Sequence, residues 1–221
     1  MFIPFYLSPV ESKTVRLNHI LKAFRHWLEN QNLNKSFSYR QWNTLLEEFP
    51  LGEEFMMRWN HVETYGFVIL TTETISLLKD FLGNKKVLDV GAGSGYLSNL
   101  LRLRGVNVTP IDNFSHQIMT GYTFKKFSSD IIKVDVKDHP VEDYEVIILS
   151  WPHDGMETLN KMTSGQILIY QGESCGGCTG SEDFFDALSD TSQFVELNHN
   201  LNKYHLKFSG IHDYWEVYQK L

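Results

Sequence analysis

Apolar side chains recur at helical spacing through residues 1–82. Between positions 12 and 31 they lie three and four residues apart, as on one face of a helix, which predicts a helix with one buried stripe. A second helix is predicted for residues 38–49, with Ser38 as its N-cap, and a third for residues 72–82. No clear strand is visible in this part of the chain, and residues 1–82 therefore predict a helical cap.

The pattern changes at Lys85, where short β-branched or aliphatic runs begin to alternate with helical stretches. Such alternation is expected of βαβ units around a parallel sheet. The last two runs are joined by a turn-rich stretch without a long helix, so we expect the sheet to close with an antiparallel strand. Residues 83–221 thus predict one α/β domain with seven strands, at residues 86–90, 107–111, 131–134, 145–150, 166–170, 194–201 and 214–219.

A glycine-rich turn follows the first predicted strand. Gly91, Gly93 and Gly95 stand between the aliphatic residues 86–90 and an amphipathic helical stretch. We expect Gly91 to allow the tight turn, Gly93 to let the backbone approach a ligand, and Gly95 to let the next helix pack near the strand. A GxGxG sequence alone is a weak signal. Here it occurs between a strand and a helix, with Asp89 just before it, which favours a ligand-binding turn.

Acidic residues mark the ends of three consecutive predicted strands. Asp89 lies near the end of the first, Asp112 ends the second, 23 residues later, and Asp135 follows the third. The carboxyl ends of parallel strands meet at one edge of a sheet, where a carboxylate at Asp112 can accept from ribose hydroxyls. A carboxylate at Asp135 could accept from an adenine amino group. The three residues together predict a cofactor that contains a nucleoside.

The glycine-rich turn and the acidic residues resemble the motifs of the class I S-adenosylmethionine-dependent methyltransferases. The resemblance covers roughly residues 85–221 and implies a Rossmann-like fold with a seven-stranded, mostly parallel sheet whose last strand is antiparallel. It implies S-adenosylmethionine as cofactor, with the methionine end near the first strand, the ribose at the second and the adenine at the third. The residues assigned to the cofactor are Asp89, Gly91, Ala92, Gly93, Gly95, Tyr96, Asp112, Asn113, Asp135, Val136 and Ser150.

A dinucleotide-binding fold is the competing interpretation of the glycine-rich turn. Its phosphate-binding turn has the pattern GxGxxG and leaves a helix N-terminus for the pyrophosphate. The glycines of this chain are spaced two and two, which favours the methyltransferase. A packing turn that binds nothing is a third alternative, and it is the less frequent one for such a motif between a strand and a helix.

The fourth predicted strand runs into Ser150, Trp151, Pro152 and His153, at the edge where open α/β sheets place their reacting groups. This loop is similar to the Asp/Asn/Ser-Pro-Pro-aromatic loop of amino-methyltransferases, with Trp151 in place of the first proline and His153 in place of the aromatic residue. His153 is a candidate general base, or a surface histidine that binds nothing. Trp151 and Pro152 are candidates for contact with the acceptor, and core packing is the alternative for Trp151.

Three further residues are candidates outside this loop. Glu173 lies in a glycine-rich stretch after the fifth strand and is a candidate acidic catalytic group at the rim of the site. Tyr65 and Trp59 lie before the sheet, in a segment that forms a lid in many enzymes of the family that the motifs resemble. Tyr65 is a candidate catalytic residue and Trp59 a candidate acceptor contact, while the alternative is that both join the cap to the sheet.

The same glycine-rich stretch contains the two cysteines, Cys175 and Cys178. Their spacing is that of zinc ligands, but zinc takes four ligands and there is no second pair. We therefore expect no metal. The residue that caps the following helix is expected to be Ser181 or Thr179.

The charge of the chain narrows the choice of methyl acceptor. The formal net charge is −7, and the densest basic stretches are two isolated lysine doublets, so nucleic acid is not the expected partner. A small molecule or a protein side chain is expected instead. A non-catalytic S-adenosylmethionine-binding module and a nucleic-acid amino-methyltransferase are the alternative functions.

Two features bear on the location of the protein. No run approaches the roughly 20 apolar residues of a membrane-spanning helix. The two cysteines lie only three positions apart, so they cannot staple a domain of this size. Both features favour a reducing, cytoplasmic setting away from membranes.

Overall fold

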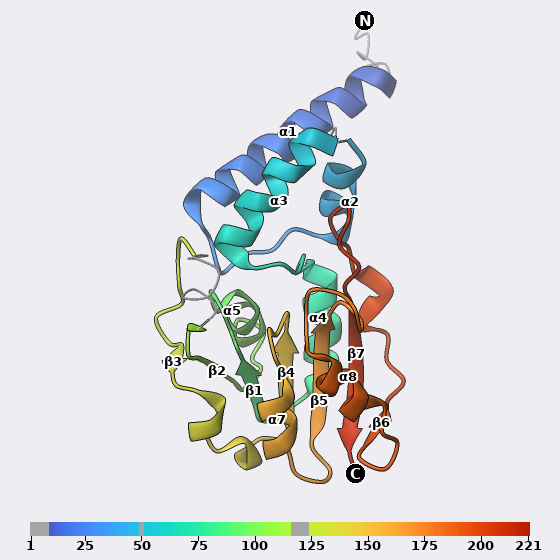
Figure 1. Cartoon of the computed structure of the whole chain (residues 1–221). Helices are drawn as coiled ribbons and strands as arrows, with labels where there is room; N and C mark the ends of the chain where they lie inside the picture. The colour runs from blue at the N-terminus through green and yellow to red at the C-terminus, as the bar shows by residue number, and fades with distance from the viewer. Residues whose placement is uncertain (1–8, 49–50, 116–123) are drawn as a thin grey trace, which may run out of the picture.

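A seven-stranded sheet forms the centre of the molecule (Figure 1). The computed structural model describes residues 9–48, 51–115 and 124–221. The strands lie in the order β3-β2-β1-β4-β5-β7-β6, with β1 to β5 parallel and β7 antiparallel to both of its neighbours. Their bounds are β1 Val87–Val90, β2 Val108–Asp112, β3 Ile132–Lys133, β4 Val146–Ser150, β5 Ile167–Gly172, β6 Phe194–Glu196 and β7 Tyr214–Lys220. The predicted α/β fold, mostly parallel with an antiparallel last strand, is confirmed.

Helices cover both faces of the sheet and one of its ends. The helix α4 and the short helix α5 pack on one face, α7 and α8 pack on the other, and α1, α2 and α3 lie at the end toward which β4 and β5 run (Figure 1). None of the described helices is long and apolar enough to cross a bilayer. Their bounds are α1 Pro9–Asn30, α2 Tyr39–Glu48, α3 Leu51–Tyr65, α4 Thr72–Leu82, α5 Tyr96–Arg102, α7 Met156–Lys161 and α8 Glu182–Ser189, with 3-10 turns η1 Val136–Asp138, η2 Val141–Asp143 and η3 Leu201–Tyr204.

The central strands are apolar on both sides because both faces of the sheet are covered. Successive side chains of a strand point to opposite faces. In β1, Val87 joins the cluster beneath α4 and α5, and Leu88 joins the cluster beneath α7 and α8. In β4, Ile148 and Ile147 divide in the same way. This is why the sequence shows continuous aliphatic runs rather than alternation.

The three predicted helices of the cap region are present, and their ends follow from capping. Ser38 and Gln41 form a reciprocal cap at the start of α2, in which the Ser38 Oγ accepts from the Gln41 N–H at 3.3 Å and the Gln41 Oε1 accepts from the Ser38 N–H at 3.0 Å. Thr71 caps α4, and Gly83 ends it with a φ of 56°. The predicted last residue of the second helix, Phe49, lies outside the described residues.

The helix α3 is absent from the sequence interpretation because it lacks one apolar stripe. Its exposed side chains include Phe55, Met56 and Trp59, whereas the polar residues His61 and Thr64 are buried. An amphipathic pattern of period 3.6 requires the opposite arrangement. Tertiary contacts, rather than a single stripe, therefore determine which side of α3 is buried.

Two strands are shorter than predicted. The run 131–134 forms a strand only at β3, and the run 194–201 forms one only over β6 before the chain continues into η3. Both lie at an edge of the sheet, where each pairs with a single neighbour. Edge strands are commonly short, because a long unpaired edge exposes backbone hydrogen-bonding groups.

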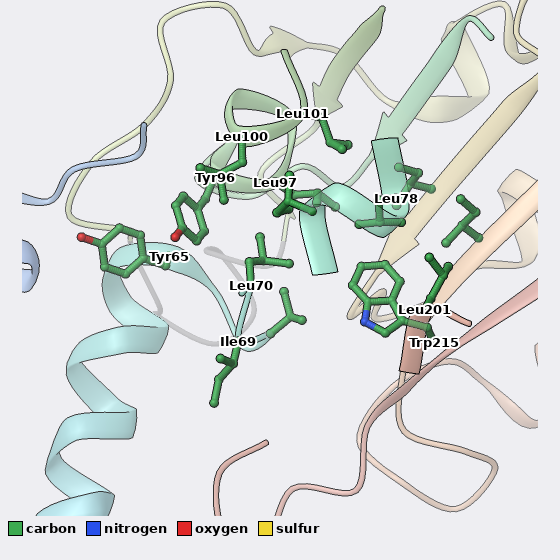
Figure 2. Packing of buried hydrophobic residues seen from close by; sticks show 14 of the residues in the cluster. Tyr65, Ile69, Leu70, Leu78, Tyr96, Leu97, Leu100, Leu101, Leu201 and Trp215 are labelled. Carbon is green, nitrogen blue, oxygen red and sulfur yellow. The ribbon is translucent and has the colours of Figure 1, made fainter. Parts of the chain in front are cut away.

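The helical cap and the sheet share one hydrophobic core. It contains Trp27 on α1 and Trp42 on α2 together with Ile148 of the sheet. Where the two parts meet, Tyr65 at the end of α3 lies beside Tyr96 on α5, with ring centroids 4.7 Å apart (Figure 2). The position of the cap over the sheet is therefore fixed by side-chain packing.

His61 is fully buried inside this core. Neither ring nitrogen has a partner at normal hydrogen-bond geometry. Burial lowers the pKa of His61 to about 3, and the Gly66 backbone offsets only part of that effect. The imidazole is therefore neutral in the folded protein at ordinary pH, surrounded by the rings of Trp27, Trp42, Tyr65 and Phe208.

His61 is expected to make the stability of the protein depend on pH. Its pKa is lower in the folded than in the unfolded chain, so between pH 6.5 and 3 the unfolded chain binds the extra proton and stability falls with falling pH. From pH 7 to pH 5 this contribution is about 2 kcal/mol. In urea unfolding, the free energy of unfolding of His61→Leu should therefore fall less than that of the wild type over this pH range, by the same amount. His26→Leu, at an exposed position on α1, is the control and should retain the wild-type dependence.

Candidate active site

A cavity of about 510 Å³ opens at the carboxyl ends of β1 to β4. The end of α3 and residues 66–70 close it from the side of the cap. This volume is within the range of pockets that bind small molecules and cofactors. Of the residues assigned to the cofactor from the sequence, those that line it are Asp89, Gly91, Ala92, Gly93, Tyr96, Asp112, Asn113, Asp135, Val136 and Ser150.

The glycine-rich turn is held against β2 by backbone hydrogen bonds. The N–H groups of Gly91 and Ala92 both donate to the carbonyl of Ile111, at 2.9 and 3.0 Å. Gly91 has a φ of 71°, and a Cβ at this position would have no atom within 4 Å. The positive φ therefore suits the tight turn expected of Gly91, and the space where its side chain would lie is open.

Gly95 has a different function in the structure. It precedes α5 with a φ of 77° and does not line the cavity. A Cβ at Gly95 would lie 2.8 Å from the Cβ of Ser128, whose N–H donates to the Ser94 carbonyl at 2.9 Å. The glycine thus allows the segment before β3 to pack on the turn, rather than the packing of the helix on the strand that the sequence suggested.

The ends of β2 and β3 bring three polar side chains to one side of the cavity. The Asp112 carboxylate accepts from the Gly93 N–H at 2.7 Å and from the Phe114 N–H at 2.6 Å. The Asn113 amide donates to Asp135 at 2.8 Å. This bond, with one from the Lys137 backbone, lowers the pKa of Asp135. Both aspartates are therefore held in fixed positions as hydrogen-bond acceptors.

Asp89 is a buried carboxyl at the floor of the cavity, with 1% of its surface exposed. Burial raises its pKa to about 6, the negative charge of Asp112 adds to the rise, and the hydrogen bond from Ser98 at 2.6 Å opposes it. A carboxyl whose ionisation is this costly is stabilised by a positive charge placed beside it. The floor of the cavity is thus suited to a cationic group.

The formal charges around the cavity are mostly negative. The acidic lining residues are Asp89, Asp112, Asp135, Asp154 and Glu157. Of the described residues that line the cavity, Lys137 is the one that carries a formal positive charge at neutral pH. Such a lining attracts cations and repels a pyrophosphate.

The loop after β4 forms the opposite wall. Trp151 has a φ of 52°, which is strained for a bulky residue, and its ring stacks on Phe67 with centroids 4.3 Å apart. Pro152 and His153 also line the cavity, and His153 is exposed at its edge. All four residues from Ser150 to His153 therefore lie at the cavity.

A buried polar network that the sequence analysis missed supports this loop. Gln171 on β5 is fully buried and bonds both to Ser150 and to Asp213, which itself lies just before β7. Asp213 also accepts from the indole of Trp151 and contacts His205. No motif marks these residues. The only signal in the sequence is a glutamine at the end of an apolar strand and an aspartate just before another.

No protein-family model matches the chain, and no curated protein does. Many solved structures are similar to it. One is a 1,6-didemethyltoxoflavin N1-methyltransferase of Burkholderia thailandensis with bound S-adenosylhomocysteine, at 15% identity and a TM-score of 0.43, covering 67% of this chain and 77% of that one. Another is a TehB-like S-adenosylmethionine-dependent methyltransferase of Corynebacterium glutamicum, at 16% identity and a TM-score of 0.45, covering 76% and 97%.

A third is the N-methyltransferase NodS of Bradyrhizobium japonicum, at 15% identity and a TM-score of 0.43, covering 67% of this chain and 94% of that one. The likeness is one of fold. We therefore take the function of this chain from the residues of its own cavity.

Tyr65 is among the residues that line the cavity, but its hydroxyl is bound within the cap. The hydroxyl donates to the Trp27 carbonyl at 2.9 Å, and the two rings stack with centroids 4.0 Å apart. Burial raises the pKa of Tyr65 well above its usual value. These contacts are those of a residue that joins the cap to the sheet, which was the alternative to a catalytic role.

Trp59 and Glu173 do not line the cavity. Trp59 is 45% exposed on α3 and donates its indole N–H to Glu63. The Glu173 carboxylate accepts from the N–H groups of Cys178 at 2.8 Å and His212 at 3.0 Å. Glu173 therefore organises the glycine-rich loop and ties it to the segment before β7.

The glycine-rich loop is packed around Glu173. A Cβ at Gly177 would lie 2.5 Å from the Cβ of Glu173. Cys175 and Cys178 are exposed with free thiols. Ser181 caps α8 as one of the two candidates, whereas the Thr179 hydroxyl bonds inside the loop to Tyr170 and Glu173.

Asp89→Asn is expected to change the pH dependence of stability in the opposite sense to His61→Leu. The folded-state pKa of Asp89, about 6, exceeds the unfolded value of 3.8, so the wild type loses stability as the pH rises through this window. From pH 5 to pH 8 this loss is about 1 kcal/mol, and Asp89→Asn should lack it in urea unfolding. Asp190→Asn is the control, because the pKa of Asp190 is lowered to about 2 and this residue therefore stays ionised from pH 5 to pH 8. An unchanged pH dependence in Asp89→Asn would contradict the burial argument.

Substitutions at Gly91 and Gly95 should separate ligand binding from folding. Alanine at either position costs about 1–2 kcal/mol because φ is positive. Gly95→Ala adds a clash with Ser128 and should lower the thermal midpoint further than Gly91→Ala does. Gly91→Ala should weaken the binding of S-adenosylhomocysteine more strongly than its loss of stability explains. Equal effects of both variants on both measurements would contradict the different environments of the two glycines.

Proposed function

We propose that this chain is an S-adenosylmethionine-dependent methyltransferase that acts on a small molecule or a protein side chain. One observation carries the proposal. Carboxylates at the ends of β3, β2 and β1, which are neighbours in the sheet, line a single cavity with the end of β4. In that spatial order they suit the successive parts of the cofactor. Asp135 at β3 suits the adenine amino group, Asp112 at β2 the ribose hydroxyls, and Asp89 at β1 a cationic methionine end.

The residues of the cavity fit this cofactor in charge as well as in order. S-adenosylmethionine carries a positive sulfonium and a positive ammonium group, and the cavity has five acidic residues against one lysine. A dinucleotide would bring a pyrophosphate into the same negative field. The antiparallel β7 between β5 and β6 also differs from the order 3-2-1-4-5-6 of the dinucleotide-binding fold. Both features support the methyltransferase.

The cofactor would supply an activated methyl group, and the chain would supply position. With the methionine end at β1, the next strand end in the sheet is β4, so the acceptor would lie at Ser150 to His153. Holding two reactants in line accounts for much of the rate in reactions of this kind. His153, exposed at the edge of the cavity, is the side chain that we propose to take the proton that the acceptor loses.

The charge around the acceptor side supports a small molecule or a protein side chain over nucleic acid. Asp154 and Glu157 are exposed beside the loop after β4 and line the cavity. Their carboxylates would repel a phosphate backbone. This acidic border disfavours the nucleic-acid amino-methyltransferase among the alternatives.

Calorimetric titration tests the cofactor site directly. The wild type should bind S-adenosylmethionine and S-adenosylhomocysteine in the micromolar range and should not bind NAD. Asp112→Ala removes a charged acceptor and should weaken both bindings by roughly tenfold to a hundredfold. Asp190→Ala removes a half-buried carboxylate that lies outside the cavity, and this variant should bind like the wild type. Failure of the wild type to bind either compound would reject the proposal.

A further inference from the structure

We propose that Asp213 is a positioning residue of this site, which acts through Gln171 to fix the direction of the Ser150 hydroxyl. The Ser150 Oγ then faces the cavity as a hydrogen-bond acceptor and selects a ligand group that donates. This inference rests on the proposed function, since it concerns the side of the cavity where the methyl acceptor would lie.

Strand register brings these residues to one level of the sheet. Ser150 of β4 is paired with Gln171 of β5, and Gln171 is paired in turn with Trp215 of β7, two residues after Asp213. The Ser150 Oγ lies 3.1 Å from the Gln171 Oε1, and the Gln171 Nε2 lies 2.5 Å from the Asp213 Oδ2. The chain of hydrogen bonds therefore runs across three neighbouring strands, from behind the cavity to its wall.

The direction of each hydrogen bond follows from the chemistry of the groups. The Trp151 indole N–H can only donate, and it lies 3.1 Å from the Asp213 Oδ2, so this oxygen is an acceptor. Gln171 directs its amide nitrogen to the same oxygen and must then present its carbonyl oxygen to Ser150. The Ser150 hydroxyl donates its one proton to that carbonyl oxygen. Its lone pairs remain for the cavity, where an amine, amide or hydroxyl group of a ligand can donate to them.

The burial of the network makes this arrangement rigid. Asp213 is 1% exposed and Gln171 is fully buried, so neither can exchange its partners for water. The His205 Nε2 lies 3.0 Å from the second carboxylate oxygen of Asp213 and gives it a further partner. A buried carboxylate without hydrogen-bond donors would strongly destabilise the fold. The donors around Asp213 are therefore held in place.

The same carboxylate holds Trp151 in its strained conformation. A left-handed bulky residue persists only where surrounding contacts over-determine it. Trp151 has three such contacts: its N–H donates to the Gln171 carbonyl at 2.7 Å, its indole donates to Asp213, and its ring stacks on Phe67. Asp213 thereby positions both the hydroxyl and the aromatic wall of the acceptor side.

Two ligands that differ at one group test the proposal. Sinefungin has an amine-bearing carbon where S-adenosylmethionine has its sulfonium, and S-adenosylhomocysteine has no donor there. Calorimetry should show that the wild type binds sinefungin at least about tenfold more tightly than S-adenosylhomocysteine, the range expected for a hydrogen bond to a charged group. In Ser150→Ala and Asp213→Ala this ratio should fall severalfold, to the preference for a cation that the acidic lining alone provides. In Asp213→Asn the ratio of the two affinities should stay within threefold of the wild-type ratio, because an amide oxygen can still accept from Trp151 and Gln171.

Glu54→Ala is the matched control. Glu54 is also a buried carboxylate that accepts two hydrogen bonds, from the N–H and hydroxyl of Ser209, but it lies outside the cavity. The Glu54→Ala variant should have a lower thermal midpoint of unfolding but the wild-type ratio of the two affinities. A ratio that stays at its wild-type value in Asp213→Ala, or that is about one in the wild type, overturns the proposal.

A measurement on the ligand-free protein separates this inference from the proposed function. The indole N–H of Trp151, assigned by its loss in Trp151→Phe, should exchange with solvent much more slowly than that of the exposed Trp59, and Asp213→Ala should remove this protection. Fast exchange of the Trp151 indole overturns the network whatever the protein binds. Absence of binding of either compound, with the indole protected, rejects the proposed function and the selection of a donor, while the network stands.

Discussion

The arrangement of the whole site depends on the burial of β1 between β2 and β4. Parallel pairing on both sides brings the carboxyl ends of these three strands to one edge of the sheet, and the chain can leave β1 there only by turning sharply. The positive φ angles of the glycines allow that turn. The N–H groups of this turn donate hydrogen bonds to the Ile111 carbonyl and the Asp112 carboxylate of β2. Residues that would hold a cofactor therefore also hold the turn in place.

The fold, and the meeting of the glycine-rich turn with the aspartates at one cavity, could be predicted because they depend on local patterns. Short aliphatic runs that alternate with helical stretches mark the strands after residue 85, and the glycine spacing and the aspartates at strand ends can be recognised without knowledge of any distant contact. The helix α3 was not predicted because its burial is decided by the cap: Phe55 is exposed and His61 is buried, against the order that a sequence pattern would favour.

The loop after β4, where we propose that the methyl acceptor lies, could be predicted only in part, for a related reason. Ser150 to His153 are adjacent in the sequence and follow a strand, so their position was foreseeable. The residues that support them are not adjacent: Gln171 and Asp213 are 42 positions apart and meet only through the pairing of β5 with β7. Glu173 shows the converse error, since an acidic residue in a glycine-rich loop suggests chemistry, yet its carboxylate binds the backbone of its own loop.

The network behind β4 has a consequence for how such a site can vary during evolution. Ser150 donates a hydrogen bond to Gln171, and Gln171 donates one to Asp213. A change in one of the three therefore leaves a buried polar group unpaired. A descendant that acquired a different acceptor could not substitute these positions one at a time without a loss of stability at the intermediate step. Coordinated replacement of all three would be the expected signature of altered specificity in this lineage.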